Sequence, residues 1–561
     1  MKKVFKIYLS CMMVLLIFIL ALPLGAFAAT EYDLYVNGER FTSDKLTIAC
    51  GSGTATFDPS TNTLTLNNAT IDTGCIIKQI HDPRDHENYN NSIYGIYSKI
   101  DTLKVIVNGN NTISTTKTDE SAVLKLNTIS GFYCSGNLEI SGNGKLKVDI
   151  SDISYDQQKD GNFWVLGIQA SDIKVTNTTI DVSLSDISIS KSSYSLIHHG
   201  ISTAWHCTLN SCNITANCDV LLPNSYSTSS ADGMYITGNI TLNNSNITAF
   251  GNSCGVICDE FNGNSGTVNA SAKAVLPDDS STAFSAFTLN LNGAVINATA
   301  ESEYMTKAVS AYNANIKSGT INAECKGSAD YSYGIWGYHF NMTGGNITAK
   351  ACAITIGGEE SYGIRAKDDF KISGGNIIAS GYTNAISSKS YNVSEYKSPE
   401  IIVATMVNAA NAVKTNNAKD IETALYVKIS KDVHTHTFDS NWNYNEEGHW
   451  HDSNCGHAEK SGYAAHTFDN DACTVCDYKK LLSSTVTDTS SNDTESNESN
   501  TSSIPDDTVS DNSSVQDANT GNQGNSEQDP PADLTVLWIG IGAIVIIAAV
   551  AVTLIIIKKK K

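Results

Sequence analysis

The chain has 561 residues, of which 41% are hydrophobic and 17% charged, and its formal net charge at pH 7 is −21. This acidic balance disfavours nucleic acid as a partner, because a phosphate backbone attracts basic surfaces. The chain contains 40 glycines but only nine prolines. Outside its two ends no apolar pattern follows the helical period. We therefore expect one elongated all-β domain rather than several globular ones.

The two ends of the chain are predicted to be targeting segments. Residues 1–28 have the features of a signal peptide, because two lysines precede an apolar run and Ala26-Phe27-Ala28 offers a cleavage site. Residues 534–557 are apolar enough for one transmembrane helix, and the lysines of 558–561 are expected in the cytosol. Residues 481–533, rich in Ser, Thr, Asn and Asp, are predicted to form a disordered acidic stalk. The bulk of the chain is therefore expected outside the cell, on a single-pass membrane anchor.

The central part of the chain repeats one short phrase, an apolar residue followed five positions later by isoleucine. Its copies are Leu66/Ile71, Val175/Ile180, Leu209/Ile214, Leu242/Ile247, Leu291/Ile296, Ile316/Ile321, Met342/Ile347 and Ile372/Ile377. Asparagine often precedes the isoleucine, as at Asn213, Asn246, Asn346 and Asn376. We expect these asparagines to stack at one corner of a repeat, where they tolerate left-handed backbone angles and hydrogen-bond along the stack.

Small residues upstream of the isoleucines set the length of the repeat. These anchors are Gly95, Gly131, Gly167, Gly200, Gly233, Gly255, Ala308, Gly334, Gly363 and Ala385. A wider gap after Gly255 is expected to hold two rungs, with a middle anchor near Ala286. Each unit contains about three short β-type runs separated by turn residues. Three strands and three turns describe one rung of a parallel β-helix, and we predict about 11 rungs.

The segments that flank the repeats are predicted to be caps. Residues 29–72 have the pattern of two hairpins that cover the first open edge, residues 73–398 form the parallel β-helix, and residues 399–432 form the second cap. On these residues the chain resembles the pectin-lyase-like superfamily of right-handed parallel β-helices, and its opening is similar to carbohydrate-binding surface proteins of Firmicutes. The resemblance implies polysaccharide as the ligand class, but it is architectural and does not assign an activity.

Catalysis finds little support in the repeats. Pectate-type lyases use an arginine base beside calcium, and Arg365 is the one arginine placed in a rung. His199-Gly200 resembles part of the polygalacturonase motif, but neither the paired aspartates nor the Arg-x-Lys accompanies it. His198 and His199 are therefore expected at the edge of a rung. A polysaccharide lyase or hydrolase remains an alternative, and a protein-binding adhesin or spacer is another.

Binding of a polysaccharide or glycan without catalysis is the favoured function. Aromatic side chains spaced along one side of a rod can stack on successive sugars. The candidate ligand-binding residues are Trp164, Trp205, Tyr235, Tyr333, Trp336, Tyr338, Tyr362 and Arg365. A polar insertion between the first rungs carries Asp82, Asp85 and Glu87, whose oxygen ligands suit calcium.

Residues 433–480 form a separate segment rich in histidine and cysteine. Cys455 and His457 are followed by Cys473 and Cys476, the arrangement of two zinc knuckles, so these four residues are predicted to hold a structural zinc ion. A segment of this size cannot build a core unaided, and a metal would supply its folding energy. A disulfide involving Cys455 or Cys473–Cys476, with solvated histidines, is the alternative.

The segment also resembles a His-x-Phe, Trp, His-Trp-His, Cys-x-x-Cys module repeated in surface proteins of Gram-positive anaerobes. That family more often has two cysteines where this chain has Cys455 and His457, so His449, His451 and His466 are candidates to replace a ligand. Most of the chain's fourteen cysteines lie in the repeats. They are expected either to pack as small buried residues or to pair between neighbouring rungs.

Overall fold

The computed structural model describes residues 5–10, 12–13, 29–80, 89–117, 126–156, 163–190, 196–220, 229–396, 399–431, 437–454 and 460–480. Residues 5–10 and 12–13 are helical. The chain divides into two compact units, Met1–Thr437 and Phe438–Lys561. The predicted stalk and transmembrane segment lie outside the described residues, and none of the helices that are described is long and apolar enough to cross a membrane.

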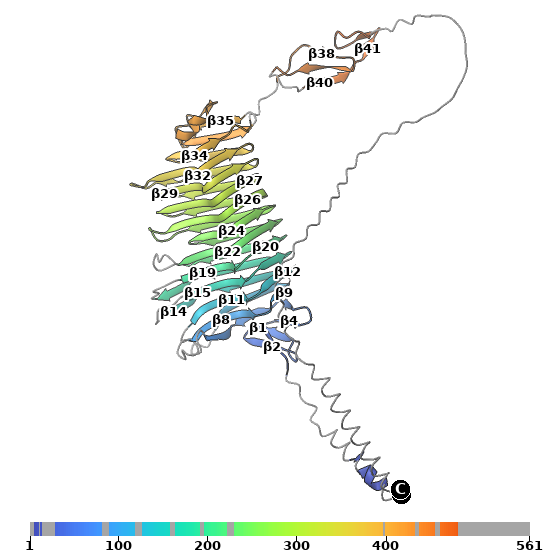
Figure 1. Cartoon of the computed structure of the whole chain (residues 1–561), viewed down its shortest axis with the longest axis vertical. Helices are drawn as coiled ribbons and strands as arrows, with labels where there is room; N and C mark the ends of the chain where they lie inside the picture. Colours follow the sequence, from blue (N-terminus) through green and yellow to red (C-terminus); the bar gives the residue numbers. More distant parts are fainter. Residues whose placement is uncertain are drawn as a thin grey trace, which may run out of the picture. The chain divides into compact units, whose positions relative to one another are not determined.

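The first unit is built from one large, mostly parallel β-sheet. In its first ladder, each strand pairs in parallel with the next (Figure 1). The strands are β8(Tyr89–Ser98), β11(Leu126–Cys134), β15(Phe163–Ala170), β19(Leu196–Thr203), β22(Ser230–Asn243), β24(Cys254–Gly263), β26(Ser280–Glu301), β27(Met305–Lys326), β29(Tyr331–Met342), β32(Glu360–Ile372) and β34(Asn384–Asn392).

Two further ladders run beside the first. The second joins β5(Thr63–Asn67), β9(Thr102–Asn108), β12(Asn137–Gly142), β16(Ile173–Thr176) and β20(Cys207–Asn210), and then continues into β22. The third joins β6(Thr70–Thr73), β10(Asn110–Lys117), β13(Lys145–Ile150), β17(Thr179–Ser185), β21(Asn213–Asp219), β23(Ser245–Gly251) and β25(Gly266–Lys273), runs through β26 and β27, and ends in β30(Asn346–Lys350) and β33(Asn376–Ser380). The chain visits each ladder in turn before returning one strand further along.

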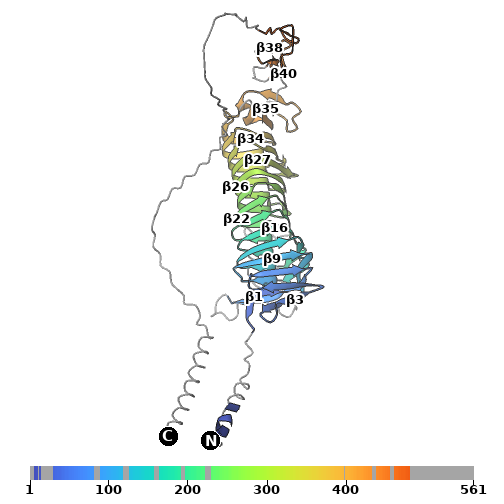
Figure 2. The same ribbon diagram turned by 90° about the vertical axis from the view of Figure 1, so that its right-hand side faces the viewer.

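This winding makes a nearly closed sheet that is compatible with a β-helix-like fold. Strands of successive turns lie side by side in both ribbon views (Figure 2). From β22 onward one long strand serves the first and second ladders, and β26 and β27 pass through all three. Two small parallel pairs, β14(Ile153–Asp156) with β18(Ile187–Ser190) and β28(Ser328–Ala329) with β31(Ala353–Ile354), extend the turns locally.

The repeat isoleucines form the core of the third ladder. Ile180, Ile214, Ile247, Ile296, Ile321, Ile347 and Ile377 occupy equivalent paired positions, with Val268 completing the column, and all are buried. In the first copy, Ile71 pairs with Ile113. Ile113 lies two positions further along its strand than the residue that is aligned with the later isoleucines. The predicted phrase therefore identifies the inward face of the sheet, with a shift of register in the first copy.

The small anchors stand where neighbouring turns approach closely. A Cβ atom on Gly167 would lie 2.3 Å from the carbonyl oxygen of Gly200, and one on Gly233 would lie 2.6 Å from that of Gly255. The anchor between Gly255 and Ala308 is Ala283, three residues before the expected Ala286, because the carbonyl of Ala283 meets Gly255. A side chain larger than a methyl group has no room in this column.

The asparagines stack as expected, but they do not carry the left-handed backbone. Asn246 Nδ2 donates to Asn213 Oδ1 at 2.9 Å, and Asn376 Nδ2 donates to Asn346 Oδ1 at 2.8 Å. The positive φ angles fall one or two residues earlier, at Ser211, Asn244, Gly345 and Gly375. At this corner one residue therefore adopts the left-handed backbone angle, and a different residue makes the hydrogen bond along the stack.

Antiparallel strands occupy both ends of the first unit. At the start, β1(Glu31–Val36) pairs with β2(Glu39–Thr42) and with β8, while β3(Thr47–Cys50), β4(Gly53–Asp58) and β5 form a meander, and β7(Cys75–Ile80) pairs with β8. At the other end, β37(Tyr426–Lys431) joins β33 to β35(Pro399–Ala404), beside β36(Val413–Thr415) and the 3₁₀ helix Ala418–Thr423. These strands cover the open edges of the ladders.

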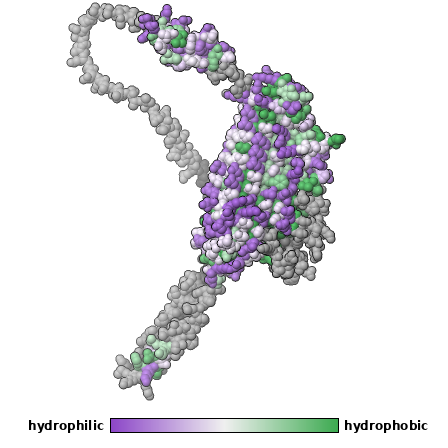
Figure 3. Space-filling model, turned by 180° about the vertical axis from the view of Figure 1, so that it is seen from behind, coloured by the Kyte–Doolittle hydropathy of each residue, from purple (hydrophilic) through white to green (hydrophobic). Residues whose placement is uncertain are grey.

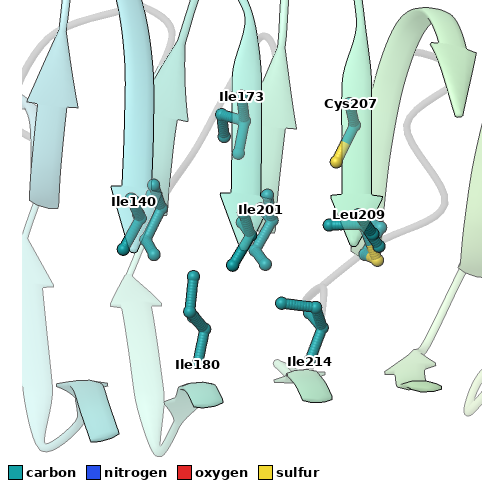
Figure 4. Close-up of a pocket in the computed structure, with 10 residues that line it drawn as sticks. Ile140, Ile173, Ile180, Ile201, Cys207, Leu209 and Ile214 are labelled. Carbon is teal, nitrogen blue, oxygen red and sulfur yellow. The ribbon is translucent and has the colours of Figure 1, made fainter. Parts of the chain in front are cut away.

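The interior is a packed apolar core rather than a binding channel. Among the described residues it contains a small cavity lined by apolar side chains and Cys207, with Ile140, Ile173, Ile201 and Leu209 around it (Figure 4). A cavity without polar groups holds no ordered water and offers a polar ligand no partner. On the face drawn in Figure 3, hydrophilic residues predominate on the first unit and hydrophobic ones are scattered among them.

All twelve described cysteines are buried and unbonded. Burial raises the pKa of the Cys75 and Cys207 thiols to about 12. Of the two alternatives for the cysteines of the repeats, small buried residues describe the structure and cross-rung disulfides do not.

Candidate functional site

The second unit brings two histidines and two cysteines together. It is a small antiparallel structure of β38(Asn443–Tyr444), β39(Gly448–Asp452) and β40(Lys460–Ala465), followed by the hairpin β41(Phe468–Asp469) and β42(Ala472–Cys473). His449 comes from β39, His466 follows β40, and Cys473 ends β42 shortly before Cys476. The ligand atoms of these four residues all lie within 4.8 Å of one another.

Contacts inside this cluster orient each histidine. The Cys473 sulfur lies 3.8 Å from His449 Nδ1, and the Cys476 sulfur lies 3.5 Å from His466 Nδ1. His466 Nε2 donates to the carbonyl of Asn445 at 2.7 Å, which leaves the lone pair of Nδ1 facing the sulfurs. A carbonyl that fixes the tautomer of a ligating histidine is a common outer partner of metal sites.

Hydrogen bonding favours the thiolate at Cys473 but not at Cys476. Partial burial by itself would raise the pKa of Cys473, but hydrogen bonds from the backbone of Val475 and Cys476 outweigh it and lower the pKa to about 6, whereas burial raises the pKa of Cys476. A thiolate is the form that binds a metal. Two sulfurs and two imidazole nitrogens at this spacing fit tetrahedral zinc, so the donor set suits a structural zinc ion.

Three of the four cluster residues are also the core of the second unit. Among its described residues, 438–454 and 460–480, the buried ones are Gly448, His449, Cys473 and Cys476, while His466 is half-buried. No apolar side chain there is buried to the same degree. Without a metal the cluster would be a set of polar groups held away from water, whereas a bound ion would turn it into the main stabilising contact of the unit.

The structure selects among the predicted ligands. Cys473 and Cys476 are joined by His449 and His466, while Cys455 and His457 lie outside the described residues. His451 is not in the cluster, because its Nδ1 lies 3.0 Å from the carbonyl of Asn441 and its ring packs 3.8 Å from that of Trp442. A register shift in the pairing with β40 separates His449 from His451. The predicted calcium ligands Asp82, Asp85 and Glu87 also lie outside the described residues.

The second candidate site is an aromatic surface on the first unit. Phe287, Tyr312 and Tyr338, which we call the aromatic ladder, stand on the adjacent strands β26, β27 and β29. Their ring centroids are 4.8 and 4.4 Å apart, with interplanar angles of 10° and 23°. Phe287, at one end of this stack, is 57% exposed, whereas Tyr312 and Tyr338 are half-buried.

Trp336 stands beside the aromatic ladder and is surrounded by cations. Its ring is nearly perpendicular to that of Tyr338, at 87°, with centroids 5.7 Å apart. Lys307 Nζ lies 4.7 Å from the Trp336 centroid, and Lys367 Nζ lies 5.2 Å from both Trp336 and Tyr338. On the next strand the Arg365 guanidinium lies 4.8 Å over Tyr362. These contacts are cation–π interactions.

The other predicted ligand-binding residues do not all lie together on the surface of the first unit. Tyr333 stacks on Tyr362 with centroids 6.2 Å apart, but it is buried and its hydroxyl donates to Glu360 at 2.6 Å. Trp164 on β15 and Trp205 in the turn after β19 are exposed but lie on strands distant from Trp336. The paired column from Tyr235 to Trp336 passes through Ile257, Ser285 and Ser310, so no continuous row of rings connects them.

The histidines expected at a rung edge are instead buried in β19. His198 is fully buried, and burial lowers its pKa to about 3. His199 stacks on Tyr235 with centroids 4.4 Å apart, and its Nε2 lies 3.3 Å from Asp232 Oδ2. Both the carboxylate and Ser230 approach the same ring nitrogen, at 3.3 and 3.2 Å, which is not the geometry of a nucleophile relay.

Sequence reasoning missed Phe287, Tyr312, Lys307 and Lys367. The sequence does contain a pattern that marks three of these four residues. Equivalent positions on successive strands are occupied by Ala286, Ala311, Gly337 and Ala366. The residues that follow them are Phe287, Tyr312, Tyr338 and Lys367. Comparison of the chain with protein-family models, with curated proteins and with solved structures finds no match. The function of this chain is therefore inferred from its residue contacts and from the sequence features described above.

Proposed function

We propose that this chain is a cell-surface protein whose first unit, a right-handed parallel β-helix of the pectin-lyase-like kind, binds a polysaccharide without cleaving it. A signal peptide at residues 1–28 and a transmembrane helix at 534–557 would expose the bulk of the chain on a stalk. The zinc-binding second unit lies between the β-helix and the stalk in the sequence.

The aromatic ladder beside Trp336 is the observation that carries the proposal. Exposed rings on a regular sheet can hold the apolar face of a sugar, and neighbouring hydroxyls and ammonium groups can hydrogen-bond to its edges. Phe287 is the exposed ring of the stack, Tyr312 and Tyr338 follow it with their hydroxyl groups, and Lys367 lies against Tyr338 at the other end. Buried positions of the sheet use rings only as core, as in the stack of Phe340 on Phe370.

Retention on polysaccharides tests this proposal. Purified full-length protein in detergent is expected to bind to soluble and insoluble polysaccharides, and Phe287→Ala is expected to weaken the binding by on the order of tenfold. Trp205→Ala removes an exposed ring in a turn away from the aromatic ladder and serves as the matched control. No retention on any glycan would favour a protein-binding adhesin or spacer instead.

A second candidate function, a polysaccharide lyase, is favoured by one hydrogen bond between a histidine and a carboxylate. His339 Nδ1 is hydrogen-bonded to Asp369, and the His339 ring lies 5.7 Å from that of Tyr312. A carboxylate that holds Nδ1–H leaves Nε2 as a base, which could remove the proton beside a uronate carboxylate while the C4–O bond breaks. An unsaturated product absorbing ultraviolet light, lost in His339→Gln, would establish this activity. Binding without such a product supports the first function.

A further inference from the structure

Positive charge gathers around Trp336 in a chain whose net charge is −21. Lys307 and Lys367 contact the same indole ring at 4.7 and 5.2 Å. Arg365 stands beside Trp336 at the paired position of β32. We call these three side chains the cation cluster. Like charges held close together repel one another, so a cluster of three cations needs an explanation.

The nearby carboxylates are engaged with other groups. Asp368 pairs with Lys389 at 2.8 Å, Asp369 pairs with Lys371 at 2.8 Å and with His339, and Glu360 accepts from Tyr333. Among the residues that the structure describes, no carboxylate lies within ion-pair distance of any member of the cation cluster. The described contacts of these three cations therefore include aromatic rings but no carboxylate.

Two members of the cluster carry an unrelieved electrostatic cost. Burial and then the nearby charge of Lys367 lower the pKa of Lys307. Arg365 donates through Nη1 to Ser387, but its buried Nε has no hydrogen-bond partner within the described structure. A partly buried cation and an unsatisfied guanidinium nitrogen are both stabilised when an anion approaches.

We infer that the surface formed by Trp336, the aromatic ladder and the cation cluster binds an acidic polysaccharide, with a sugar ring against the aromatic side chains and its anionic group near Lys307 and Lys367. This inference rests on the proposed function and specifies its ligand class. Aromatic rings without the lysines would suit neutral sugars equally well. The lysines without the rings would attract any polyanion, so the combination points to an acidic sugar.

Affinity measurements with four polymers test this inference on the full-length protein in detergent. Polygalacturonate and dextran sulfate are anionic glycans that carry carboxylate and sulfate groups, dextran is neutral, and polyglutamate is anionic without sugar rings. We expect at least one anionic glycan to bind on the order of tenfold more tightly than both dextran and polyglutamate. Whichever of the two binds identifies the acidic group.

Charge variants complete the test. The double variant Lys307→Gln/Lys367→Gln is expected to lose on the order of tenfold in affinity for the anionic glycan. Lys317→Gln/Lys326→Gln removes the same charge from exposed positions of β27 and is expected to change it less than twofold. Circular dichroism spectra of both variants report whether the fold is retained, and a reduced affinity in a folded variant supports the inference.

Contrary outcomes separate the two proposals. Equal binding of dextran, insensitive to the Lys307 and Lys367 substitutions, would overturn the acidic ligand and leave glycan binding in place. Equal binding of polyglutamate would show that charge alone acts and would overturn the sugar-specific surface. Failure of every glycan to bind would overturn both the inference and the proposed function.

Discussion

The two units of this chain solve the same stability problem by opposite means. The first buries long columns of isoleucine, valine and leucine between stacked strands, and each turn relies on its neighbours. In the second, the buried side chains of its described residues are those of His449, Cys473 and Cys476. The first unit is stabilised by repetition of apolar contacts, and the second depends on one cluster of polar ligands.

Metal removal should have the largest effect and should separate the units. A strong chelator is expected to unfold the second unit, because structural zinc supplies on the order of 10 kcal/mol in small domains. Hydrogen exchange followed by mass spectrometry should show lost protection in residues 437–480 and none in the first unit. Equal protection with and without chelator in the second unit would contradict the zinc assignment.

Ligand variants sharpen this comparison. His466→Gln is expected to reduce the bound zinc, measured by elemental analysis of the purified protein, because Nδ1 of His466 faces the Cys476 sulfur. His451→Gln, next to Trp442 and outside the cluster, should keep the full zinc content. A loss of zinc in His451→Gln alone would show that the wrong histidine has been assigned.

A core substitution in the first unit should have the next largest effect. Ile321 is fully buried and pairs with Ile296 and Ile347, so Ile321→Ala is expected to lower the free energy of unfolding by about 2–5 kcal/mol. Ile106→Ala removes a side chain that is 37% exposed and should cost less. Denaturant unfolding followed by the β-sheet circular dichroism signal measures the loss of stability in both variants. Zinc content should be unaffected, since the two units have separate cores.

The asparagine stack should contribute less than the core. Asn297 accepts from Asn322 at 2.8 Å and donates to Asn269 at 2.8 Å, so Asn297→Ala removes two exposed hydrogen bonds. A loss of about 1 kcal/mol is expected in the same denaturant experiment. A loss as large as that of Ile321→Ala would mean that the corner, rather than the apolar columns, determines the stability of the first unit.

The smallest predicted effect concerns one surface carboxylate. The hydrogen bond from Lys371, with that from His339, outweighs partial burial and lowers the pKa of Asp369. A carboxyl group whose pKa is lower in the folded state stabilises the fold above its unfolded pKa of about 3.9, and this contribution is lost as the pH falls through the folded pKa. Asp369→Asn should cost less than about 1 kcal/mol at pH 7, and this cost should shrink as the pH falls through the folded pKa of Asp369. A pH-independent difference between the proteins would contradict this assignment.

The apolar repeat made the all-β architecture predictable, because equivalent isoleucines must face the same interior wherever turns stack. The same reasoning placed the extra anchor three residues away from Ala283, since the β26 and β27 strands run without the breaks that mark other turns. The same pattern also predicted a left-handed backbone angle at Asn246, whereas the structure has the positive φ angle at Asn244. Corner geometry depends on the backbone of several residues, which a pattern of side chains does not reveal.

The candidate sites were predictable only in part, for a different reason. The Cys473-x-x-Cys476 spacing marks a metal site, but the partners of the two cysteines come from strands whose pairing decides between His449 and His451. In the same way Trp336 and Tyr338, both half-buried, were recognisable as candidate binding aromatics, whereas Lys307 is one turn earlier in the sequence and meets Trp336 only across the sheet. Contacts between the outward side chains of successive turns depend on which residues are paired, and the spacing within one short segment does not show that pairing.

The buried thiols have a consequence for the lifetime of the folded protein in an oxidising environment. While the strands stay stacked, Cys207, Cys254 and Cys325 are out of reach of oxidants and their raised pKa keeps them unreactive. Once unfolded in an oxidising environment, many free sulfurs on one chain can crosslink in non-native pairs faster than the turns restack. Unfolding would then be a one-way event, and the durability of the protein would be governed by its rate of opening rather than by its equilibrium stability.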